Sequence, residues 1–167
     1  MVLGGAASGK SAFAEALVLA DPSPRVYLAT AQAFDDELRN KIQIHTERRQ
    51  QDWTTLEAPA DTASALIGLN ERQLCLLDCA TMWLSNQMLA ENDLETAQAE
   101  LLKAIGRCPA RLVIVSNEVG QGIVPDNALA RRFRDAQGRL NIELAKIADT
   151  VVQVVAGLPN VLKGSIS

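Results

Sequence analysis

The sequence has a single histidine, and its three cysteines include no pair at the Cys-x-x-Cys spacing. A zinc site built from cysteine and histidine is therefore not expected, because such sites combine several of these side chains. We interpret Cys75, Cys79 and Cys108 as reduced thiols of a cytoplasmic protein. No apolar run approaches the ~18 residues that span a membrane, and no basic-then-apolar signal segment opens the chain, so we expect neither a membrane span nor export.

The chain also has fewer basic than acidic side chains. The 167 residues include 16 lysines and arginines against 20 aspartates and glutamates, which gives a net charge of −4. A broad nucleic-acid-binding surface requires a basic domain, so we expect no binding of DNA or RNA. An anionic ligand must instead be held by a local device. The sequence contains no internal repeat, low-complexity stretch or Pro/Gly/Ser-rich linker, so residues 1–167 are interpreted as one domain.

Short apolar segments alternate with helical ones along the chain. The predicted strands are mostly unbroken apolar runs, which is typical of strands buried on both faces of a parallel sheet; they are Met1–Leu3, Arg25–Thr30, Gln73–Asp78, Arg111–Ser116 and Thr150–Ala156, with Thr54–Leu56 as a weaker candidate. The predicted helices are Gly9–Ala20, Asp35–Gln50, Asp61–Leu69, Asp93–Ile105 and Asn127–Ala148. This alternation predicts an α/β fold with a mostly parallel sheet flanked by helices.

The strongest motif follows the first predicted strand. It reads Gly4, Gly5, Ala6, Ala7, Ser8, Gly9, Lys10 and Ser11 and matches the phosphate-loop pattern G-x-x-x-x-G-K-[ST] in full. Backbone N–H groups of such a loop converge on phosphate oxygens, the lysine reaches the β- and γ-phosphates, and the hydroxyl is offered to Mg²⁺. The next helix points its positive end at the same anion. We therefore predict a single P-loop NTPase-like domain, against the alternative of a chance glycine-rich turn.

A P-loop site also needs an acidic side chain, supplied from the end of another strand, to help hold the metal. Leu74–Asp78 is an apolar run that ends in a carboxylate, so Asp78 is the candidate partner of Ser11 in holding Mg²⁺, directly or through water. The alternative is an ordinary aspartate at a strand end or a helix cap.

The lone histidine lies on a predicted helix. Leu38, Ile42 and His45 fall on one helical face, where a histidine is more often packed or solvated than catalytic. Two arginines change that balance, because Arg48 and Arg49 stand three and four residues further on and can share a ligand with the imidazole. Nearby cations favour neutral imidazole, which is the form that can attack phosphorus. His45 is therefore a candidate nucleophile.

The segment Ser116–Pro125 follows another apolar strand and contains two glycines and a proline. Ligands of open α/β sheets bind beyond the carboxyl ends of the strands, so Asn117 and Glu118 are expected to face the ligand crevice. The alternative is a plain connection. The last predicted helix carries Arg131, Arg132, Arg134 and Arg139, for which a solvated face is the simplest interpretation and a subunit contact or anionic substrate the alternative.

Together these segments resemble the bifunctional adenosylcobinamide kinase / adenosylcobinamide-phosphate guanylyltransferase family of cobalamin biosynthesis. The resemblance covers nearly the whole chain. It rests on Gly4–Ser11, Leu28–Ala31, Asp35–Glu37, Ile42–Arg49, Leu77–Cys79, Asn117–Pro125 and Leu129–Asn141. The phosphate loop alone is common to many folds, whereas the histidine segment, the Asn-Glu-Val-Gly loop and the Phe-Arg-Asp-x-x-Gly-Arg-x-Asn helix together are specific.

The resemblance implies two reactions and an assembly. The first reaction phosphorylates the aminopropanol hydroxyl of adenosylcobinamide with ATP or GTP, and the second transfers GMP from GTP to the resulting adenosylcobinamide phosphate. The family passes GMP through a covalent guanylyl-histidine, and His45 is the matching position. The family also forms a homotrimer, which implies the same for this chain.

The resemblance further assigns nucleotide contacts and a metal. They fall on the phosphate loop Gly4–Ser11 and on Ala29, Thr30, Ala31, Thr46, Glu47, Arg48, Arg49, Glu57 and Asp78, with Lys10 as a catalytic residue beside His45 and with Mg²⁺ at Ser11 and Asp78. Three departures from the family pattern stand out. The family usually has a longer first strand than Met1–Leu3. Ala7 occupies a position where the family usually has arginine, and Asp78 one where it often has glutamate.

Two other functions remain open from the residues alone. A small P-loop kinase of another metabolite would use Lys10, Ser11 and Asp78 and leave His45 without a role. A nucleotide-binding regulatory module would bind GTP with little turnover and form no histidine adduct.

Overall fold

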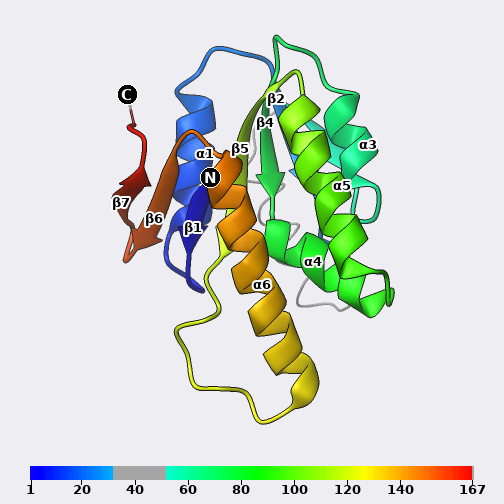
Figure 1. The fold of residues 1–167 in the computed structure, drawn as a ribbon. Coiled ribbons are helices and arrows are strands. Elements are labelled where there is room, and N and C mark those ends of the chain that lie inside the picture. The colour runs from blue at the N-terminus through cyan, green and yellow to red at the C-terminus, as the bar shows by residue number, and fades with distance from the viewer. Residues whose placement is uncertain (32–51, 167) are drawn as a thin grey trace.

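The computed structural model describes residues 1–31 and 52–166. One seven-stranded sheet has the order β3-β2-β4-β5-β1-β6-β7 and is parallel except for the antiparallel pair β6–β7 (Figure 1). The strands are β1 (Val2–Gly4), β2 (Arg25–Ala29), β3 (Trp53–Glu57), β4 (Leu74–Asp78), β5 (Arg111–Asn117), β6 (Val151–Val155) and β7 (Leu158–Lys163).

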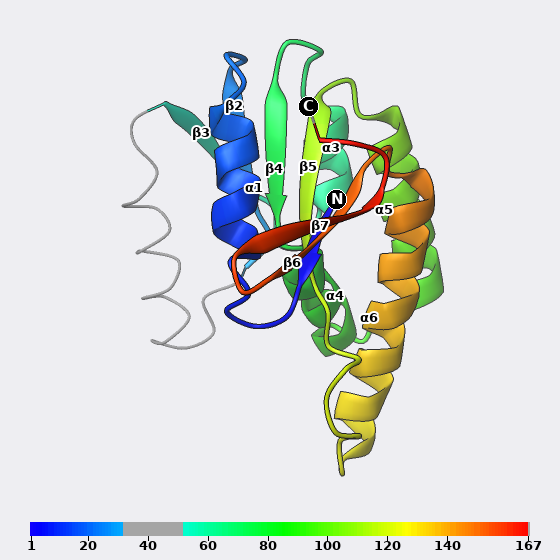
Figure 2. The same ribbon diagram turned by 90° about the vertical axis from the view of Figure 1, so that its left-hand side faces the viewer.

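Helices cover both faces of this sheet. The described helices are α1 (Lys10–Leu19), α3 (Thr62–Ile67), α4 (Ala80–Leu89), α5 (Leu94–Arg107) and α6 (Ala128–Ile147). Figure 2 shows α1 on one side of the sheet and α3, α5 and α6 on the other. The predicted mostly parallel sheet flanked by helices is thereby confirmed.

The central strand β4 shows why the strands read as unbroken apolar runs. Leu74 and Leu76 belong to the buried cluster beneath α1, whereas Cys75 and Leu77 belong to the cluster beneath α3–α6. Successive side chains of a strand point to opposite faces, so a strand covered on both sides must be apolar at every position. Burial raises the pKa of the Cys75 thiol to about 12, so this thiol behaves as a small apolar side chain.

All six predicted strands are present, including the weak candidate at Thr54–Leu56, which lies within β3. The predicted helix at Asp35–Gln50 lies outside the described residues. Asp61 and Asp93 cap α3 and α5 with their side chains, accepting hydrogen bonds from Ser64 N and Glu95 N. Two observed elements, α4 and β7, are absent from the sequence prediction. Among the described helices, none is long and apolar enough to cross a membrane.

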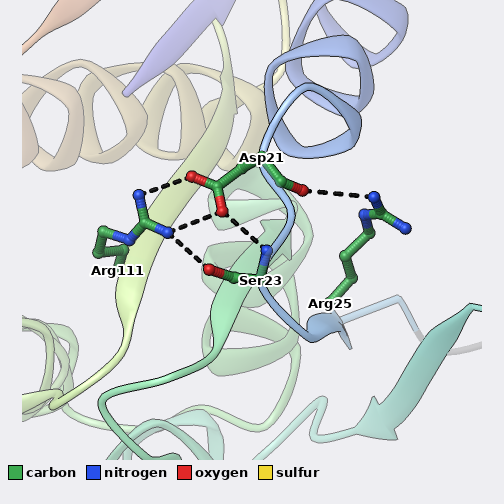
Figure 3. A network of polar contacts seen from close by, with 4 residues as sticks. All are labelled: Asp21, Ser23, Arg25 and Arg111. Carbon is green, nitrogen blue, oxygen red and sulfur yellow. Dashed lines mark hydrogen bonds and ion pairs between the residues drawn. The ribbon is translucent and has the colours of Figure 1, made fainter.

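A polar network ties the end of α1 to the start of β5, at the edge of the sheet opposite the phosphate loop (Figure 3). Arg111 Nη1 lies 2.7 Å from Asp21 Oδ2, and Arg111 Nη2 donates to Asp21 Oδ1 and to Ser23 Oγ, both at 2.8 Å. Ser23 N also donates to Asp21 Oδ1, at 2.9 Å. The hydrogen bonds from Arg111 and Ser23 hold the pKa of Asp21 well below its ordinary 3.8.

This network makes part of the stability depend on pH. A carboxylate with a depressed pKa in the folded state stabilises the fold above its unfolded-state pKa, and that contribution is lost as pH falls. We therefore expect Asp21→Asn to unfold at lower urea concentration than wild type at pH 7. The difference should shrink once the pH falls below the ordinary aspartate value. Urea melts of both proteins between pH 7 and pH 3 measure it, and a pH-independent difference would contradict the role given to the charge.

Candidate active site

The phosphate loop joins β1 to α1 and has the curvature that its glycines allow. A Cβ at Gly4 would stand 2.4 Å from Ser8 Oγ and 2.7 Å from Val154 O, so only glycine fits there. Gly9 has a φ of +90°, a conformation that other residues rarely adopt. The loop is also held from outside, since Gly157 N in the β6–β7 turn donates to Ser8 O at 2.8 Å.

The loop presents unpaired polar groups to a ligand. Gly9 caps α1 without a side-chain hydrogen bond, which leaves the first N–H groups of a ten-residue helix for an anion. Ser8 Oγ is buried and has no partner within the described part of the chain. Bound phosphate oxygens would satisfy such groups, and this supports the interpretation of Gly4–Ser11 as a nucleotide cradle.

Lys10 is the first residue of α1 and bends back over the loop. Its Nζ donates to Gly5 O at 3.1 Å. Burial lowers the pKa of Lys10 below its ordinary 10.5, and the nearby groups Cys79 and Asp78 oppose that shift. The ammonium group is thus half-buried and within electrostatic reach of Asp78. It is placed to exchange the Gly5 carbonyl for a phosphate oxygen.

Asp78 ends β4 and is held by the only tyrosine of the sequence. Tyr27 Oη donates to Asp78 Oδ2 at 2.5 Å, and Tyr27 is buried, with 5% of the residue exposed. The ring meets Trp53 edge to face, with centroids 6.3 Å apart. The phenol fixes one carboxylate oxygen of Asp78 and leaves the other to the ligand. Sequence reasoning missed Tyr27, although its place two residues before Ala29 on β2 points to the same crevice.

Removing only this hydroxyl tests the arrangement. We expect Tyr27→Phe to fold normally and to need about tenfold more Mg²⁺ for half-maximal activity, because a loosely held carboxylate orients its ligand poorly. Titrating Mg²⁺ in the kinase assay measures this requirement, and titrating Mn²⁺ into the nucleotide complex by electron paramagnetic resonance measures it without turnover. An unchanged metal requirement in both would contradict the positioning of Asp78 by Tyr27.

The carboxyl ends of three neighbouring strands lie in one row. Ala29 of β2 pairs in register with Glu57 of β3 and with Asp78 of β4. The structure thus brings Ala29, Glu57 and Asp78 to the sheet edge where the phosphate loop lies, and Ala31 follows two residues after Ala29. The resemblance assigns nucleotide contacts to all four. Glu57 is exposed.

Thr30 also lies at this edge, but its side chain points into the protein and not toward the nucleotide site. It is fully buried, its Oγ1 donates to Cys79 O and accepts from Cys79 N, each at 2.8 Å, and its carbonyl accepts from Asn86 Nδ2 at 2.7 Å. Its hydroxyl therefore locks the end of β2 to the start of α4. Asn86, which also donates to Pro59 O at 3.0 Å, was not singled out from the sequence.

The loop after β5 begins beside the phosphate loop and is braced by α6. Glu118 N donates to Gly4 O at 2.9 Å. Arg131 Nη1 donates to Asp126 O at 2.6 Å, and Arg134 Nη1 donates to Ile123 O at 3.1 Å. These two arginines therefore hold the loop that starts at the site, while Arg131 stays exposed to solvent as the simplest interpretation expects.

The nucleophile candidate and its neighbours cannot be placed in the same way. His45 and Thr46, Glu47, Arg48 and Arg49 lie outside the described residues. What the described residues bring together is a phosphate loop, a lysine and a strand-end carboxylate, which is the equipment of a nucleotide site.

Comparison with known proteins identifies the family of this chain. The family described as cobinamide kinase / cobinamide phosphate guanyltransferase matches residues 1–162. The chain belongs to this family. The phosphate loop, Tyr27, Asp78 and the loop after β5 all lie within the matched range.

Curated relatives agree with the family assignment. The bifunctional adenosylcobalamin biosynthesis protein CobP of Pseudomonas aeruginosa is 42% identical over 167 residues, covering 98% of this chain and 96% of that protein. The bifunctional adenosylcobalamin biosynthesis proteins named CobU from Escherichia coli and Salmonella typhimurium are 38% and 42% identical, each covering 95% of this chain and 96% of its own length. The chain is thus an enzyme of the bifunctional kinase and guanylyltransferase family, as the resemblance implies.

Solved structures of remote proteins share the fold. A protein of Pyrococcus horikoshii OT3 superposes with a TM-score of 0.57 at 8% identity, covering 99% of this chain and 85% of its own. An ATPase of a bacterial type III secretion system superposes with a TM-score of 0.56 at 12% identity, covering 96% of this chain and 55% of its own. These likenesses confirm the P-loop NTPase-like fold.

Proposed function

We propose that this chain phosphorylates adenosylcobinamide with ATP or GTP and then transfers GMP from GTP to adenosylcobinamide phosphate, giving adenosylcobinamide-GDP. The observation that carries the proposal is the phosphate loop at the start of α1, with Lys10 bent back over it, in a chain whose residues 1–162 match the family. Lys10 and the free N–H groups at the start of α1 stabilise negative charge on the transferring phosphoryl group.

In the second reaction, His45 is the proposed nucleophile. Its imidazole nitrogen attacks the α-phosphorus of GTP and pyrophosphate leaves; the acceptor phosphate then attacks the same phosphorus and releases histidine. A covalent intermediate divides one difficult displacement into two easier ones. The arginines at positions 48 and 49, with Thr46 and Glu47, are proposed to bind the nucleotide in this state, together with Ala29, Ala31 and Glu57. Thr30 is proposed to act on this binding site indirectly, because its buried hydroxyl bonds the backbone of Cys79.

The residues present fit Mg²⁺ as the metal. Ser11 offers a hydroxyl and Asp78 a carboxylate, which are the oxygen donors that this hard cation takes, and Mg²⁺ commonly binds one or two protein oxygens together with phosphates. Within residues 1–31 and 52–166 there is no group of three His, Cys, Asp or Glu side chains that could hold a metal ion, so a protein-only cage is not available in this range. Bound there with the nucleotide, the cation would neutralise phosphate charge.

The assembly and compartment are part of the proposal. We propose a homotrimer in the cytoplasm. The outer strand β7 supports association, because it is exposed along its length and displays Leu158, Val161 and Leu162 with 72%, 43% and 55% exposure. Apolar side chains on an open sheet edge are typical of protein contacts. Light scattering on the purified protein measures the mass directly.

Two assays test the proposed function. With ATP, Mg²⁺ and adenosylcobinamide, mass spectrometry should detect adenosylcobinamide phosphate; with GTP and that phosphate, it should detect adenosylcobinamide-GDP. Formation of the first product alone would reduce the chain to a kinase. Formation of neither product, in folded protein that binds nucleotide, would contradict the proposal and favour a regulatory module.

A further inference from the structure

The carboxyl end of β5 stands between the two halves of the nucleotide site. In the sheet, β5 lies between β1, which leads into the phosphate loop, and β4, which ends in Asp78 (Figure 2). Asn117, the last residue of β5, pairs in register with Gly4. A side chain at this point is a neighbour of both the phosphate loop and the Asp78 strand.

The backbone of Asn117 is fixed on both sides by buried polar side chains. Its N–H donates to Thr81 Oγ1 of α4 at 2.8 Å, and its C=O accepts from Asn141 Nδ2 of α6 at 3.0 Å. Thr81 and Asn141 are 6% and 8% exposed. The next N–H, that of Glu118, is held by Gly4 O at 2.9 Å. Buried polar groups cost free energy unless they are paired, so three of them converging on one turn hold it in a single conformation.

The alternation of side chains tells which way Asn117 faces. Val115 packs in the cluster beneath α1, and Ser116 Oγ donates to Asn141 Oδ1 of α6 on the opposite face at 2.6 Å. Asn117 therefore faces the α1 side. Asp78 faces the same side, because Leu77 belongs to the opposite cluster. Within residues 1–31 and 52–166 the carboxamide of Asn117 has no hydrogen-bond partner, although both of its backbone groups do.

We propose that Asn117 is a further catalytic residue of the kinase reaction, whose carboxamide N–H donates to an oxygen of the γ-phosphoryl group, and that Thr81 and Asn141 are its positioning residues. This proposal rests on the proposed function. In the step, the acceptor hydroxyl oxygen bonds to the γ-phosphorus while the bond from that phosphorus to the β–γ bridging oxygen breaks. The hydroxyl proton passes to solvent, and the diphosphate leaves. A fixed donor aimed at the transferring group stabilises charge without reorganising.

The first test removes the donor. We expect Asn117→Ala to lower the kinase kcat by about 10²-fold, the usual effect of losing one fixed donor, with nucleotide affinity largely retained. Asn117→Asp has the same size but brings a negative charge toward the phosphate, so its loss should be larger. Labelling by GTP should be affected much less, because that reaction occurs at the α-phosphorus.

The second test separates positioning from general stability. Thr81→Val keeps the shape but removes the acceptor for Asn117 N, so kcat should fall about tenfold, and Thr81→Ser should restore it. Thr62→Val is the matched control: Thr62 is also a buried threonine, 0% exposed, and its Oγ1 donates to Ala58 O at 2.7 Å, but it hydrogen-bonds neither Asn117 nor its positioning residues. It is expected to change stability without changing kcat.

Each outcome decides the proposal. A wild-type kcat in Asn117→Ala, beside an active wild-type enzyme, overturns it and leaves the proposed function intact. Equal losses of kcat in Thr62→Val and Thr81→Val overturn the positioning roles. If wild type phosphorylates no acceptor, the proposed function fails, and Asn117 is judged instead on the slow transfer of the γ-phosphoryl group to water. That hydrolysis should fall in Asn117→Ala and would overturn the proposal if it did not.

Discussion

Replacing His45 with alanine is expected to abolish the covalent GMP adduct, and guanylyl transfer with it, while the kinase reaction continues in part. Alanine offers no nitrogen to attack the α-phosphorus, and the two-step route then has no first step. The kinase reaction transfers the γ-phosphoryl group directly to the acceptor and needs no such nucleophile. Intact mass after incubation with GTP and Mg²⁺ gives the answer: wild type should gain one GMP that is lost in acid, and His45→Ala should gain none.

The controls for this experiment distinguish the nucleophile from its surroundings. His45→Gln keeps a polar side chain of similar reach without a nucleophilic nitrogen, so it should also remain unlabelled. Circular dichroism and nucleotide binding establish that both variants are folded. An adduct on either variant would assign the nucleophile to another residue. Equal loss of both reactions in folded variants would argue against separate roles for His45 and the phosphate loop.

Much of the fold could be predicted because its strands are buried on both faces. A parallel strand between two layers of helices is an unbroken apolar run, and Leu74–Asp78 and Arg111–Ser116 show this directly in the sequence. The strand β7 has no such signature: its side chains are all exposed, and it contains Pro159, which is tolerated at a sheet edge. Its pairing partner β6 and the turn between them decide its structure, and neither is a local property of residues 158–163.

The helix α4 was missed for a different reason. It begins two residues after β4 ends, without glycine or proline between, and its N-cap is Cys79 rather than one of the usual capping residues. The sequence does contain a helical pattern here, because Trp83, Leu84, Gln87 and Met88 follow one another at steps of one, three and one and so lie on one face of a helix. Because it follows β4 directly, it carries Thr81 and Asn86 to the edge of the sheet where the site lies.

Some residues of the candidate site could likewise be predicted from the sequence, and others could not. Motif spacing is enough to find Gly4–Ser11 and the carboxylate of Asp78, because a phosphate cradle depends on local backbone and on a strand end. Spacing cannot find Tyr27 or Thr81, which act through partners 51 and 36 positions away in the chain. Nor does a pattern reveal that the hydroxyl of Thr30 is turned inward to Cys79.

Replacing Lys10 is expected to have the broadest effect, because the phosphate loop serves both proposed reactions. In Lys10→Met, a side chain of similar length lacks the ammonium group that stabilises charge on the phosphates. The kinase kcat should fall by at least about 10³-fold, more than for loss of a neutral donor, since a full charge is removed from a half-buried site. Guanylylation should also fall, because the same loop holds GTP. Steady-state kinase assays and intact mass measure the two losses.

The conservative variant and the pH profile sharpen this prediction. Lys10→Arg keeps the charge but replaces a compact ammonium with a planar fork, so it should restore little activity. Wild-type activity requires the charged lysine, whose pKa is lowered by burial, so the kinase rate should decline with rising pH earlier than an ordinary lysine with a pKa of 10.5 would allow. Bound phosphates act against this shift, so the decline should begin at lower pH in kcat/KM, which reports the free enzyme, than in kcat. Near-normal turnover by Lys10→Met, in protein that binds nucleotide, would mean that the loop binds without taking part in transfer.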